Sequence, residues 1–277
     1  MYKILAKEAL TPSTKLFRIE APDVARKARA GQFVVIRIDD RGERIPLTIA
    51  DWDCKEGSIT LISQEIGATT MRLGTLAAGD VLADFVGPLG LPSEVENFGT
   101  VVCVGGGVGI APVYPIARAL KEAGNRVLSV IGARCRELLF WEERMRDVSH
   151  ELVVCTDDGS HARKALVTEP LKEILQSGRP VARVIAIGPA IMMKFCSLTT
   201  QPFQVKTIVS INSIMVDATG MCGACRIEVG GQTKFVCVDG PEFDGHEVDW
   251  DLLLARQNVY LKEEKQALER FQQGSRT

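Results

Sequence analysis

Val101-Val-Cys-Val-Gly-Gly-Gly-Val-Gly-Ile-Ala-Pro112 is the stretch that decides the fold of this chain. Its first four residues predict a buried parallel strand, its glycines a loop, and residues 111–123 a helix. Glycines at such a turn let the backbone approach a pyrophosphate, and the helix N-terminus offers free amides to it. The run is not the G-x-G-x-x-G fingerprint, however, and glycine loops also serve plain tight packing.

The same alternation of strand and helix continues after this stretch. Apolar runs predict strands at 127–131, 152–155, 183–187 and 205–209, with helices between them at 136–146, 162–176 and 189–198. We therefore predict a doubly wound α/β domain over residues 98–210, whose ligand lies at the carboxyl ends of the strands. The candidate nucleotide-binding residues at these ends are Gly106, Gly107, Val108, Gly109, Ala111, Pro112, Arg134, Asp157, Gly188 and Pro189.

The charges at the nucleotide edge bear on the choice of dinucleotide. Glu137, Asp157 and Asp158 disfavour a 2′-phosphate, so we expect NAD rather than NADP. Arg134 keeps NADP as the alternative, because it could meet a phosphate or stack on an adenine. A surface salt bridge to Glu137 or Glu143 would explain Arg134 equally well.

Before the deciding stretch, residues 1–97 predict a small antiparallel β-barrel. Short β-rich runs are separated by turn-forming clusters, and Gly87-Pro-Leu-Gly-Leu-Pro92 ends the segment. The predicted strands are 14–19, 32–38, 47–51, 58–63 and 81–85.

Two segments of this barrel are candidates for holding a flavin. Thr48 could offer a hydroxyl to the flavin ring, and Gly67, Thr69 and Thr70 could donate to a diphosphate. Pro and Gly-Thr segments are also ordinary turn chemistry. The candidate flavin-binding residues are Arg44, Pro46, Leu47, Thr48, Ile62, Ser63, Gln64, Gly67, Thr69 and Thr70.

Residues 211–277 contain the spacing Asp217-x4-Cys222-x2-Cys225-x11-Cys237. A plant-type [2Fe–2S] loop uses C-x4-C-x2-C and a distant fourth cysteine, so an aspartate has the first position here. We predict a [2Fe–2S] cluster held by Asp217, Cys222, Cys225 and Cys237. A helical segment at 263–273 follows it.

Other sites fit the same cysteines. With His246 they could hold a structural zinc, and Cys222 with Cys225 could form a dithiol redox pair or pack as buried thiols. The cluster explains more of the loop, because Gly220 and Gly223 would let the backbone aim its amides at cluster sulfurs.

Composition excludes several classes of function. The chain has 277 residues, 46% of them hydrophobic, and a net charge of −2 without a basic face, so nucleic acid is not an expected partner. The uncharged stretch 101–117 contains glycines and prolines and is shorter than the roughly 20 residues of a membrane span. Five of the eight cysteines are scattered in apolar segments and the first ten residues lack an export signal, which predicts a cytoplasmic protein.

The chemistry of the expected cofactors favours a flavin. NADH gives up two electrons as hydride, whereas a [2Fe–2S] centre accepts one at a time, so a protein with both needs a carrier able to do either. The three histidines lie in charged, loop-like sequence, and we assign no residue as catalytic acid or base.

In their order along the chain these motifs resemble the ferredoxin-reductase-like electron-transfer subunits, whose relatives include the electron-transfer subunit of dihydroorotate dehydrogenase. The matching segments are Pro46-Leu-Thr48, Gly105-Gly-Gly-Val-Gly-Ile-Ala-Pro112, Gly188-Pro189 with Met192, and the cluster loop. The resemblance covers essentially the whole chain. It implies FAD in the barrel, NAD(H) in the α/β domain with Met192 among its binding residues, and a [2Fe–2S] cluster facing a larger partner subunit with a second FAD and [4Fe–4S] clusters.

Met215-Val-Asp-Ala-Thr-Gly-Met-Cys-Gly-Ala-Cys225 and Cys237-Val-Asp-Gly-Pro-Glu-Phe243 are similar to one subgroup. These are the small subunits of electron-bifurcating NADH-dependent reduced ferredoxin:NADP+ oxidoreductases, also described as sulfide dehydrogenase beta subunits. The resemblance implies a heterodimer in which this chain exchanges hydride with NAD(H) and passes single electrons through its cluster, while ferredoxin is reached through the partner.

Two alternatives stay open. One is an electron-transfer subunit of another dehydrogenase, of the dihydroorotate or sulfide type; Asp217 stands against the former, whose members have cysteine there. The other is a zinc-containing nucleotide-binding regulatory module.

One position departs from the family pattern. Many relatives place an arginine directly before the Pro-x-Ser/Thr element, to bind the flavin diphosphate. Here Ile45 has that position and Arg44 precedes it. A one-residue shift in a strand turns a side chain to the other face, so we rely on Thr48, Thr69 and Thr70 more than on Arg44.

Overall fold

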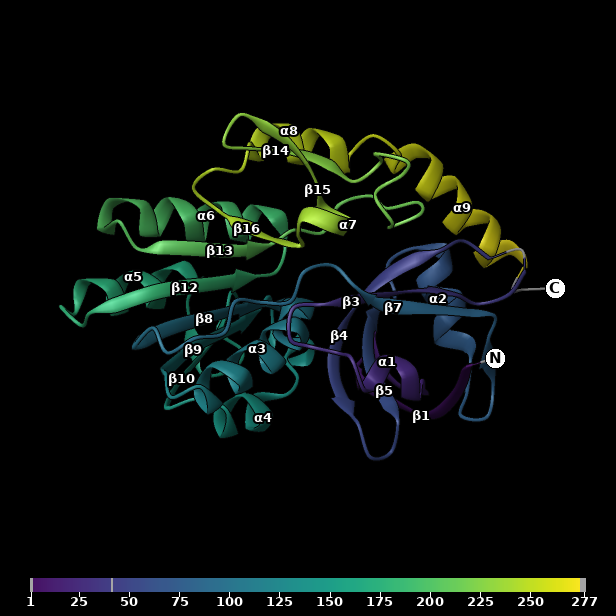
Figure 1. The fold of residues 1–277 in the computed structure, drawn as a ribbon, viewed down its shortest axis with the longest axis horizontal. Helices are drawn as coiled ribbons and strands as arrows, with labels where there is room; N and C mark the ends of the chain where they lie inside the picture. Colours follow the sequence, from purple (N-terminus) through teal and green to yellow (C-terminus); the bar gives the residue numbers. More distant parts are fainter. Residues whose placement is uncertain (1, 41, 275–277) are drawn as a thin grey trace.

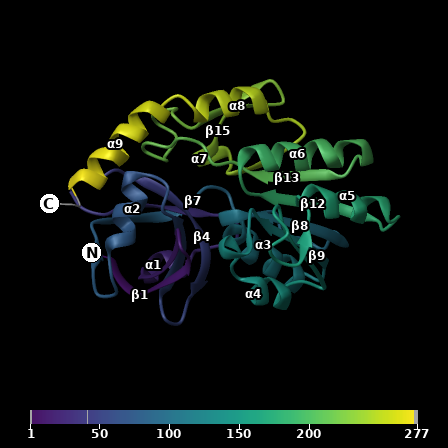
Figure 2. The same cartoon turned by 180° about the vertical axis from the view of Figure 1, so that it is seen from behind.

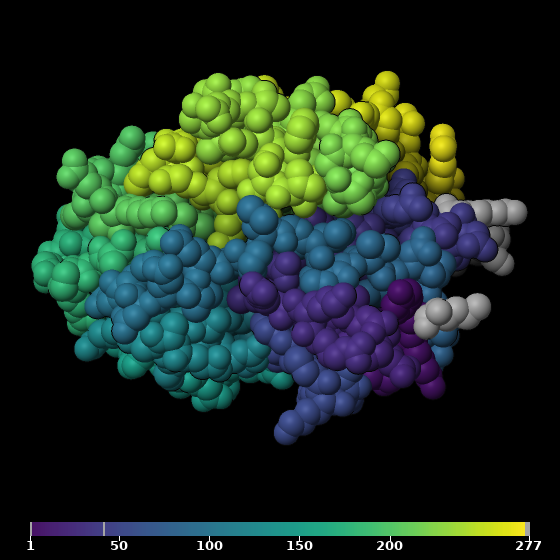
Figure 3. Space-filling model, viewed as in Figure 1, coloured from purple at the N-terminus to yellow at the C-terminus, as the bar shows by residue number. Residues whose placement is uncertain are grey.

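The computed structural model describes residues 2–40 and 42–274; residues 1 and 275–277, which belong to the predicted terminal domains, and residue 41 lie outside this part. Figure 1 shows an antiparallel sheet from the N-terminal residues, a parallel sheet from the middle of the chain, and a C-terminal segment that lies across both. The space-filling view shows the same segment covering one side of the two sheets without a break (Figure 3).

The antiparallel sheet has the strand order β6-β1-β2-β5-β4-β3-β7. Its edge strands β6 and β7 are consecutive in the chain, separated only by Ala83, so the sheet curls into a nearly closed barrel. Phe17, Ile36, Ile59 and Leu61 fill its interior. The elements are β1 (Tyr2–Thr11), β2 (Thr14–Glu20), α1 (Pro22–Ala25), β3 (Phe33–Arg37), β4 (Ile45–Asp53), β5 (Ser58–Gln64), α2 (Ala68–Thr75), β6 (Val81–Leu82) and β7 (Asp84–Leu89).

The second sheet has the order β11-β10-β9-β8-β12-β13-β16 and is parallel except for β16. Its direction of growth reverses between β8 and β12, which is the topological switch point where such sheets bind ligands. The elements are β8 (Thr100–Gly106), η1 (Gly107–Gly109), α3 (Ile110–Glu122), β9 (Arg126–Ala133), η2 (Arg136–Leu138), α4 (Glu142–Asp147), β10 (Glu151–Thr156), β11 (Arg163–Lys164), α5 (Thr168–Gln176), β12 (Val181–Ile187), α6 (Ala190–Thr200), η3 (Gln201–Phe203) and β13 (Lys206–Ser210).

Helices cover both faces of this sheet, as predicted. Successive residues of β8 point to opposite faces, so Val101 joins the buried cluster of α3 and α4 while Val102 joins that of α5 and α6. The first cluster also contains Ala50 and Ile62 of the barrel, so the barrel and the parallel sheet share buried packing around α3.

The C-terminal segment does not stand apart from the parallel sheet. Its strand β16 pairs antiparallel with β13, and its helices run from beside α6 to beside α2, a course that Figure 2 shows from behind. The elements are β14 (Arg226–Val229), β15 (Gln232–Phe235), α7 (Val236–Asp239), β16 (Glu242–Asp244), α8 (Trp250–Gln257) and α9 (Leu261–Gly274). None of the helices in the described part is long and apolar enough to cross a membrane.

Two predicted helices are wrong in extent. The segment 136–146 breaks into η2 and α4, because the backbone is extended at Leu139 and left-handed at Trp141, with a φ of 56°. The segment 162–176 becomes helical only at Thr168, because Ala162 has a φ of 52° and the two residues after it pair with β10 as strand β11. Left-handed backbone of this kind cannot continue a right-handed helix. The candidate diphosphate-binding residues Gly67, Thr69 and Thr70 lie at the start of α2, with Gly67 as its N-cap.

Candidate cofactor and cluster sites

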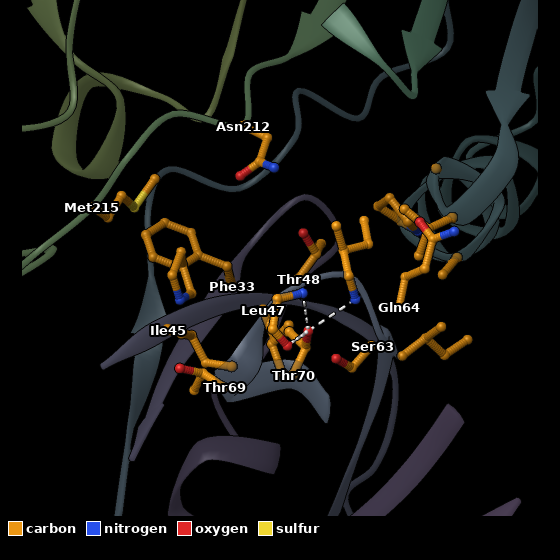
Figure 4. A pocket seen from close by; sticks show the side chains of 18 of the residues that line it. Phe33, Ile45, Leu47, Thr48, Ser63, Gln64, Thr69, Thr70, Asn212 and Met215 are labelled. Carbon is orange, nitrogen blue, oxygen red and sulfur yellow. Dashed lines mark hydrogen bonds between the residues drawn. The ribbon is translucent and has the colours of Figure 1, made fainter. Parts of the chain in front are cut away.

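A cavity of about 710 Å³ opens where the barrel, the start of α3 and the C-terminal segment meet. This volume is in the range of small-molecule and cofactor sites. Figure 4 shows Thr48, Ser63 and Thr70 approaching it from the barrel, and Asn212 and Met215 from the C-terminal segment opposite. Fourteen of the predicted residues line it: Pro46, Leu47, Thr48, Ile62, Ser63, Gln64, Gly67, Thr69, Thr70, Val108, Gly109, Ala111, Pro112 and Gly188.

Strands β3, β4 and β5 position the barrel wall of this cavity. Phe33 pairs with Thr48 across β3 and β4, which places an aromatic ring beside a hydroxyl at the cavity. The side chain of Ser63 is buried and its hydroxyl has no hydrogen-bond partner in the described structure. A buried polar atom without a partner is rare, so Ser63 fits a site that a polar ligand completes.

The threonines of α2 are already engaged. The Thr70 hydroxyl oxygen accepts from the amides of Ile66 at 3.1 Å and Gly67 at 3.0 Å, which Figure 4 draws as dashed lines. The Thr69 hydroxyl donates to Glu43 Oε2 at 2.7 Å. Thr70 therefore shapes the turn before α2, and a ligand would have to replace Glu43 to reach the Thr69 hydroxyl.

Arg44 is not among the residues that line the cavity; Ile45 lines it instead. The Arg44 side chain is exposed, and its charge helps the Arg37 guanidinium hold the pKa of Asp84 below its usual range. The one-residue shift has therefore turned the arginine to the other face. The expectation that Arg44 binds the flavin has no support in this geometry.

The glycine loop brings two strand ends close together at the switch point. A Cβ on Gly109 would lie 2.2 Å from the carbonyl oxygen of Ile187, so only glycine fits there. A Cβ on Gly106 would lie 2.2 Å from Met192 Sδ, and one on Gly188 would lie 2.8 Å from Met192 Cε. Gly106, Gly188 and Met192 thus form one packed unit beneath the start of α3, but Gly106 and Met192 do not line the cavity.

The remaining nucleotide candidates lie at other strand ends and outside the cavity. Arg134 follows β9 and Asp157 follows β10, and both are exposed. Burial and the neighbouring Asp158 raise the pKa of Asp157, while Arg134 lowers it, so Arg134 and Asp157 lie close enough to interact. Among the described ion pairs, none joins Arg134 to Glu137 or Glu143. Gly107 and Pro189 also lie outside the cavity lining.

The sequence reasoning missed a whole wall of the cavity. Asn212 and Met215 follow the carboxyl end of β13, a signal that the strand pattern contained. Tyr260, Glu263 and Glu264 reach the cavity from α9 and the residue before it, and no local pattern marks them. The further lining residues are Phe33, Glu43, Ile45, Ile66, Ala68, Ile187, Ser210, Ile211, Pro241 and Ala267.

The predicted cluster ligands come together as two pairs. Cys225 Sγ and Cys237 Sγ are 3.3 Å apart in buried surroundings. Asp217 lies against Cys222, whose amide donates to Asp217 Oδ2 at 2.8 Å, and Cys222 is exposed. In the described part of the chain no three His, Cys, Asp or Glu side chains converge on a point for a single metal ion. Two pairs suit a two-iron cluster, in which each iron takes two protein ligands.

The backbone of the loop also fits a cluster. Gly220 and Gly223 have φ values of 86° and 66°, so both make the left-handed turns for which they were singled out. The amide of Thr219, followed by the thiol and the amide of Cys222, lowers the pKa of Asp217, which favours its carboxylate form. Burial and the Cys225 thiol raise the pKa of Cys237 to about 12, so this thiol keeps its proton without a metal and would release it on binding one.

The zinc alternative loses its fourth ligand. His246 Nε2 lies 2.8 Å from the Thr200 hydroxyl, and its Nδ1 lies 3.8 Å from Asp244. His246 therefore lies beside α6 and β16, with its Nε2 engaged by Thr200, rather than at the cysteines.

Comparisons with known proteins agree with this division of sites. Residues 103–197 match the oxidoreductase NAD-binding domain, and residues 212–249 match the iron–sulfur cluster binding domain of dihydroorotate dehydrogenase B. A dihydroorotate dehydrogenase B (NAD(+)) electron transfer subunit homolog of Thermotoga maritima is 50% identical over 97% of this chain and 95% of its own. The electron transfer subunit of Desulforamulus reducens is 31% identical over 90% and 97% of the two chains.

A solved structure from work on flavin-based electron bifurcation, that of an NADH-dependent reduced ferredoxin-NADP oxidoreductase, matches with a TM-score of 0.93. It is 49% identical and covers 98% of both chains. The ferredoxin reductase of carbazole 1,9a-dioxygenase, 18% identical with a TM-score of 0.63 over 74% of this chain and 65% of its own, shares the fold. The predicted fold class and family resemblance are confirmed, and the chain belongs to the family of dihydroorotate dehydrogenase B electron-transfer subunits and their homologues.

Proposed function

We propose that this chain is the NADH-linked electron-transfer subunit of a larger oxidoreductase of the electron-bifurcating NADH-dependent ferredoxin:NADP+ type. It binds FAD in the cavity, NAD(H) at the switch point of the parallel sheet, and a [2Fe–2S] cluster in the loop from Asp217 to Cys237. The likeness to the ferredoxin-NADP oxidoreductase structure along 98% of both chains supports this choice.

One observation carries the proposal. Met215 lines the cavity, and Asp217, the first ligand of the cluster loop, follows it two residues later. The start of α3, with Gly109 and Ala111, lines the same cavity from the nucleotide side. One short region therefore joins the sites for a hydride donor, a flavin and a one-electron centre.

When bound, FAD accepts hydride from NADH and releases electrons one at a time to the cluster, which side chains cannot do. The chain's own residues bind and orient the cofactors and exclude water from the site. Phe33, Ile45 and Ile62 supply apolar walls, and Thr48 presents a hydroxyl at the barrel side. Among the described lining residues the only charged side chains are the acids Glu43, Glu263 and Glu264, so no lysine or arginine is available to bind an anion. The backbone amides at the start of α3 and α2 would therefore bind the anionic groups of the cofactors.

The surface around the cluster loop supports a protein partner. Cys222 is exposed, and Val216, Met221 and Val238 beside it are 58%, 86% and 41% exposed. Exposed apolar side chains around a redox centre suit docking of another protein. We propose a larger flavin and iron–sulfur subunit as that partner, in a heterodimer that works in the reducing cytoplasm, with ferredoxin reached through the partner.

Asp217 favours this subgroup over the dihydroorotate-linked enzymes, which have cysteine at the position. An electron-transfer role for another dehydrogenase is the second candidate, because the relatives from Thermotoga maritima and Desulforamulus reducens are named for dihydroorotate dehydrogenase B. We propose three domains: 1–97 for the flavin barrel, 98–210 for the nucleotide domain and 211–277 for the cluster segment. Strand β16 of the cluster segment pairs with β13 at the edge of the nucleotide-domain sheet.

An anaerobic NADH titration of the purified chain tests the proposal. We expect bleaching of the flavin absorbance and, on NADH or subsequent dithionite, the EPR signal of a reduced [2Fe–2S] cluster. NADPH should reduce the flavin more slowly than NADH. A colourless protein that contains zinc and no acid-labile sulfide would refute the redox assignment, and faster reduction by NADPH would refute the choice of NAD.

A further inference from the structure

Six side chains form a charged and aromatic cluster between the barrel and the helices of the parallel sheet. None of them lines the cavity. They come from β4, from α3, and from α4 with the residue before it, and Figures 1 and 2 both show α3 beside β4. The members of this cluster, which we call the clamp, are Asp51, Trp52, Tyr114, Arg118, Trp141 and Arg144.

Asp51 is the centre of the clamp. Arg118 Nη1 donates to Asp51 Oδ1 at 2.8 Å, and Arg144 Nη1 donates to Asp51 Oδ2 at 3.3 Å. The side chains of Asp51 and Arg118 are only 19% and 27% exposed. Hydrogen bonds between ionised groups with this little solvent are stronger and more directional than surface ion pairs.

Aromatic rings hold both arginines in place. The Arg118 guanidinium lies 5.2 Å from the centre of the Trp52 ring and 5.3 Å from that of Tyr114. The Arg144 guanidinium lies 4.6 Å from the Trp141 ring. Trp141 keeps a left-handed backbone with a φ of 56°, a conformation that L residues adopt only where their surroundings enforce it. The clamp is thus one fixed arrangement.

Two of the three elements that the clamp joins, β4 and α3, begin at the cavity. On α3, Ala111 lines the cavity and lies on the same helix face as Tyr114 and Arg118, three and seven residues later. On β4, Thr48 lines the cavity and Asp51 follows it.

A β-bulge aims Asp51 at the helix. Ile49 pairs with Leu61 of β5, but Asp51 pairs with Thr60, so two steps on β4 match one on β5. Such an insertion bends the strand and redirects the side chains next to it.

We propose that Asp51 and Arg118 are positioning residues for hydride transfer, which fix the distance between the nicotinamide held at α3 and the flavin held at β4. The inference rests on the proposed function. Hydride transfer moves two electrons and one proton from NADH to the flavin and leaves NAD+, and it needs the reacting atoms about 3–3.5 Å apart. Neither Asp51 nor Arg118 lines the cavity, so in this inference they act through the elements they join.

Asp51→Asn tests the inference, because it keeps the size of the side chain and removes the charge that binds both arginines. In stopped-flow experiments on the FAD- and cluster-loaded protein, we expect NADH to bleach the flavin about 10- to 100-fold more slowly, the loss that a misplacement near 1 Å causes. The long-wavelength charge-transfer absorbance of the NAD–reduced flavin pair should weaken. Reduction by dithionite, which needs no such alignment, should keep the wild-type rate.

Asp84→Asn is the matched control. Asp84 accepts from Arg37 Nε at 2.6 Å with side-chain exposures of 34% and 22%, but this pair lies within the barrel. The variant Asp84→Asn should leave both the rate of flavin reduction by NADH and the charge-transfer band unchanged. Arg118→Lys, which keeps the charge but loses the planar fork, should give an intermediate rate, and it replaces Asp51→Asn if that variant does not fold.

Wild-type rates and an unchanged charge-transfer band in Asp51→Asn, or in Arg118→Lys where that variant stands in, would overturn the inference. Equal slowing of the NADH and dithionite reactions would also overturn it, since the defect would then not lie in alignment. Failure of the wild-type chain to be reduced by NADH would instead refute the proposed function, so the two failures are distinguishable.

Discussion

At the scale of the single residue, Asp217 sets this cluster loop apart from an all-cysteine loop. Its carboxylate is ionised and held by the amides of Thr219 at 2.9 Å and Cys222 at 2.8 Å. Thiolate sulfur donates more electron density to iron than carboxylate oxygen does. We therefore expect Asp217→Cys to keep the [2Fe–2S] cluster but lower its reduction potential, as measured by an EPR-monitored redox titration.

The exposed Asp251, which binds Lys194, provides a control for this change. Asp251→Asn should leave the potential and the EPR spectrum as they are. An unchanged potential and spectrum in Asp217→Cys would show that Asp217 is not a ligand.

At the scale of the element, α9 is a helix whose residues are mostly exposed and which contacts α2. It and the residue before it bring Tyr260, Glu263, Glu264 and Ala267 to the cavity. Because these residues form one wall of the proposed flavin site, ending the chain at Gln257 should raise the Kd for FAD about 10-fold. This corresponds to a loss of about 1.4 kcal/mol of binding free energy. Fluorescence titration of the FAD-free protein measures this change.

Lys265→Ala alters α9 at a position that does not line the cavity, and it should leave the affinity for FAD unchanged. If the shortened chain bound FAD as tightly as the full one, α9 would have no part in the flavin site.

At the scale of the whole molecule, Glu242 links all three parts of the chain. It lies in β16 and accepts a hydrogen bond at 2.5 Å from Ser93, which lies between the barrel and the parallel sheet; Arg183 and Glu94 also face it. Burial raises the pKa of Glu242 to about 7. The folded chain therefore binds a proton that the unfolded chain, with its usual pKa of about 4.3, has released, so this group makes the free energy of unfolding fall as pH rises from about 4 to 7.

Glu242→Gln removes this titration. We expect the variant to match the wild type near pH 4.5 and to exceed it by about 3 kcal/mol at pH 8, in urea unfolding at each pH. Glu247→Gln, at an exposed position five residues later, should show no such pH-dependent gain. A constant difference between Glu242→Gln and the wild type at both pH values would contradict the prediction.

Elements whose own residues favour one conformation could be predicted from the sequence. Elements that form only by pairing with another strand of the chain could not. The strands β8, β9, β10, β12 and β13 are apolar runs whose burial in a sheet covered on both faces favours the extended conformation. By contrast β1, with the sequence YKILAKEALT, has helix-forming residues and becomes a strand only by pairing with β2 and β6. The strand β16 likewise depends on β13, some thirty residues earlier in the chain.

The sequence by itself determined the chemistry that needs a local spacing: the glycine loop before α3, and a loop of one carboxylate and three thiols whose φ-positive glycines let it turn. Only the tertiary structure decided which side chains close the cavity on its far side, because Tyr260 and Glu264 reach it from a segment that follows both sheets in the chain. It also brought Asp51 to Arg118, which lies 67 residues later in the chain. Contacts between residues far apart in the chain depend on how whole elements pack, and no short stretch of sequence contains that information.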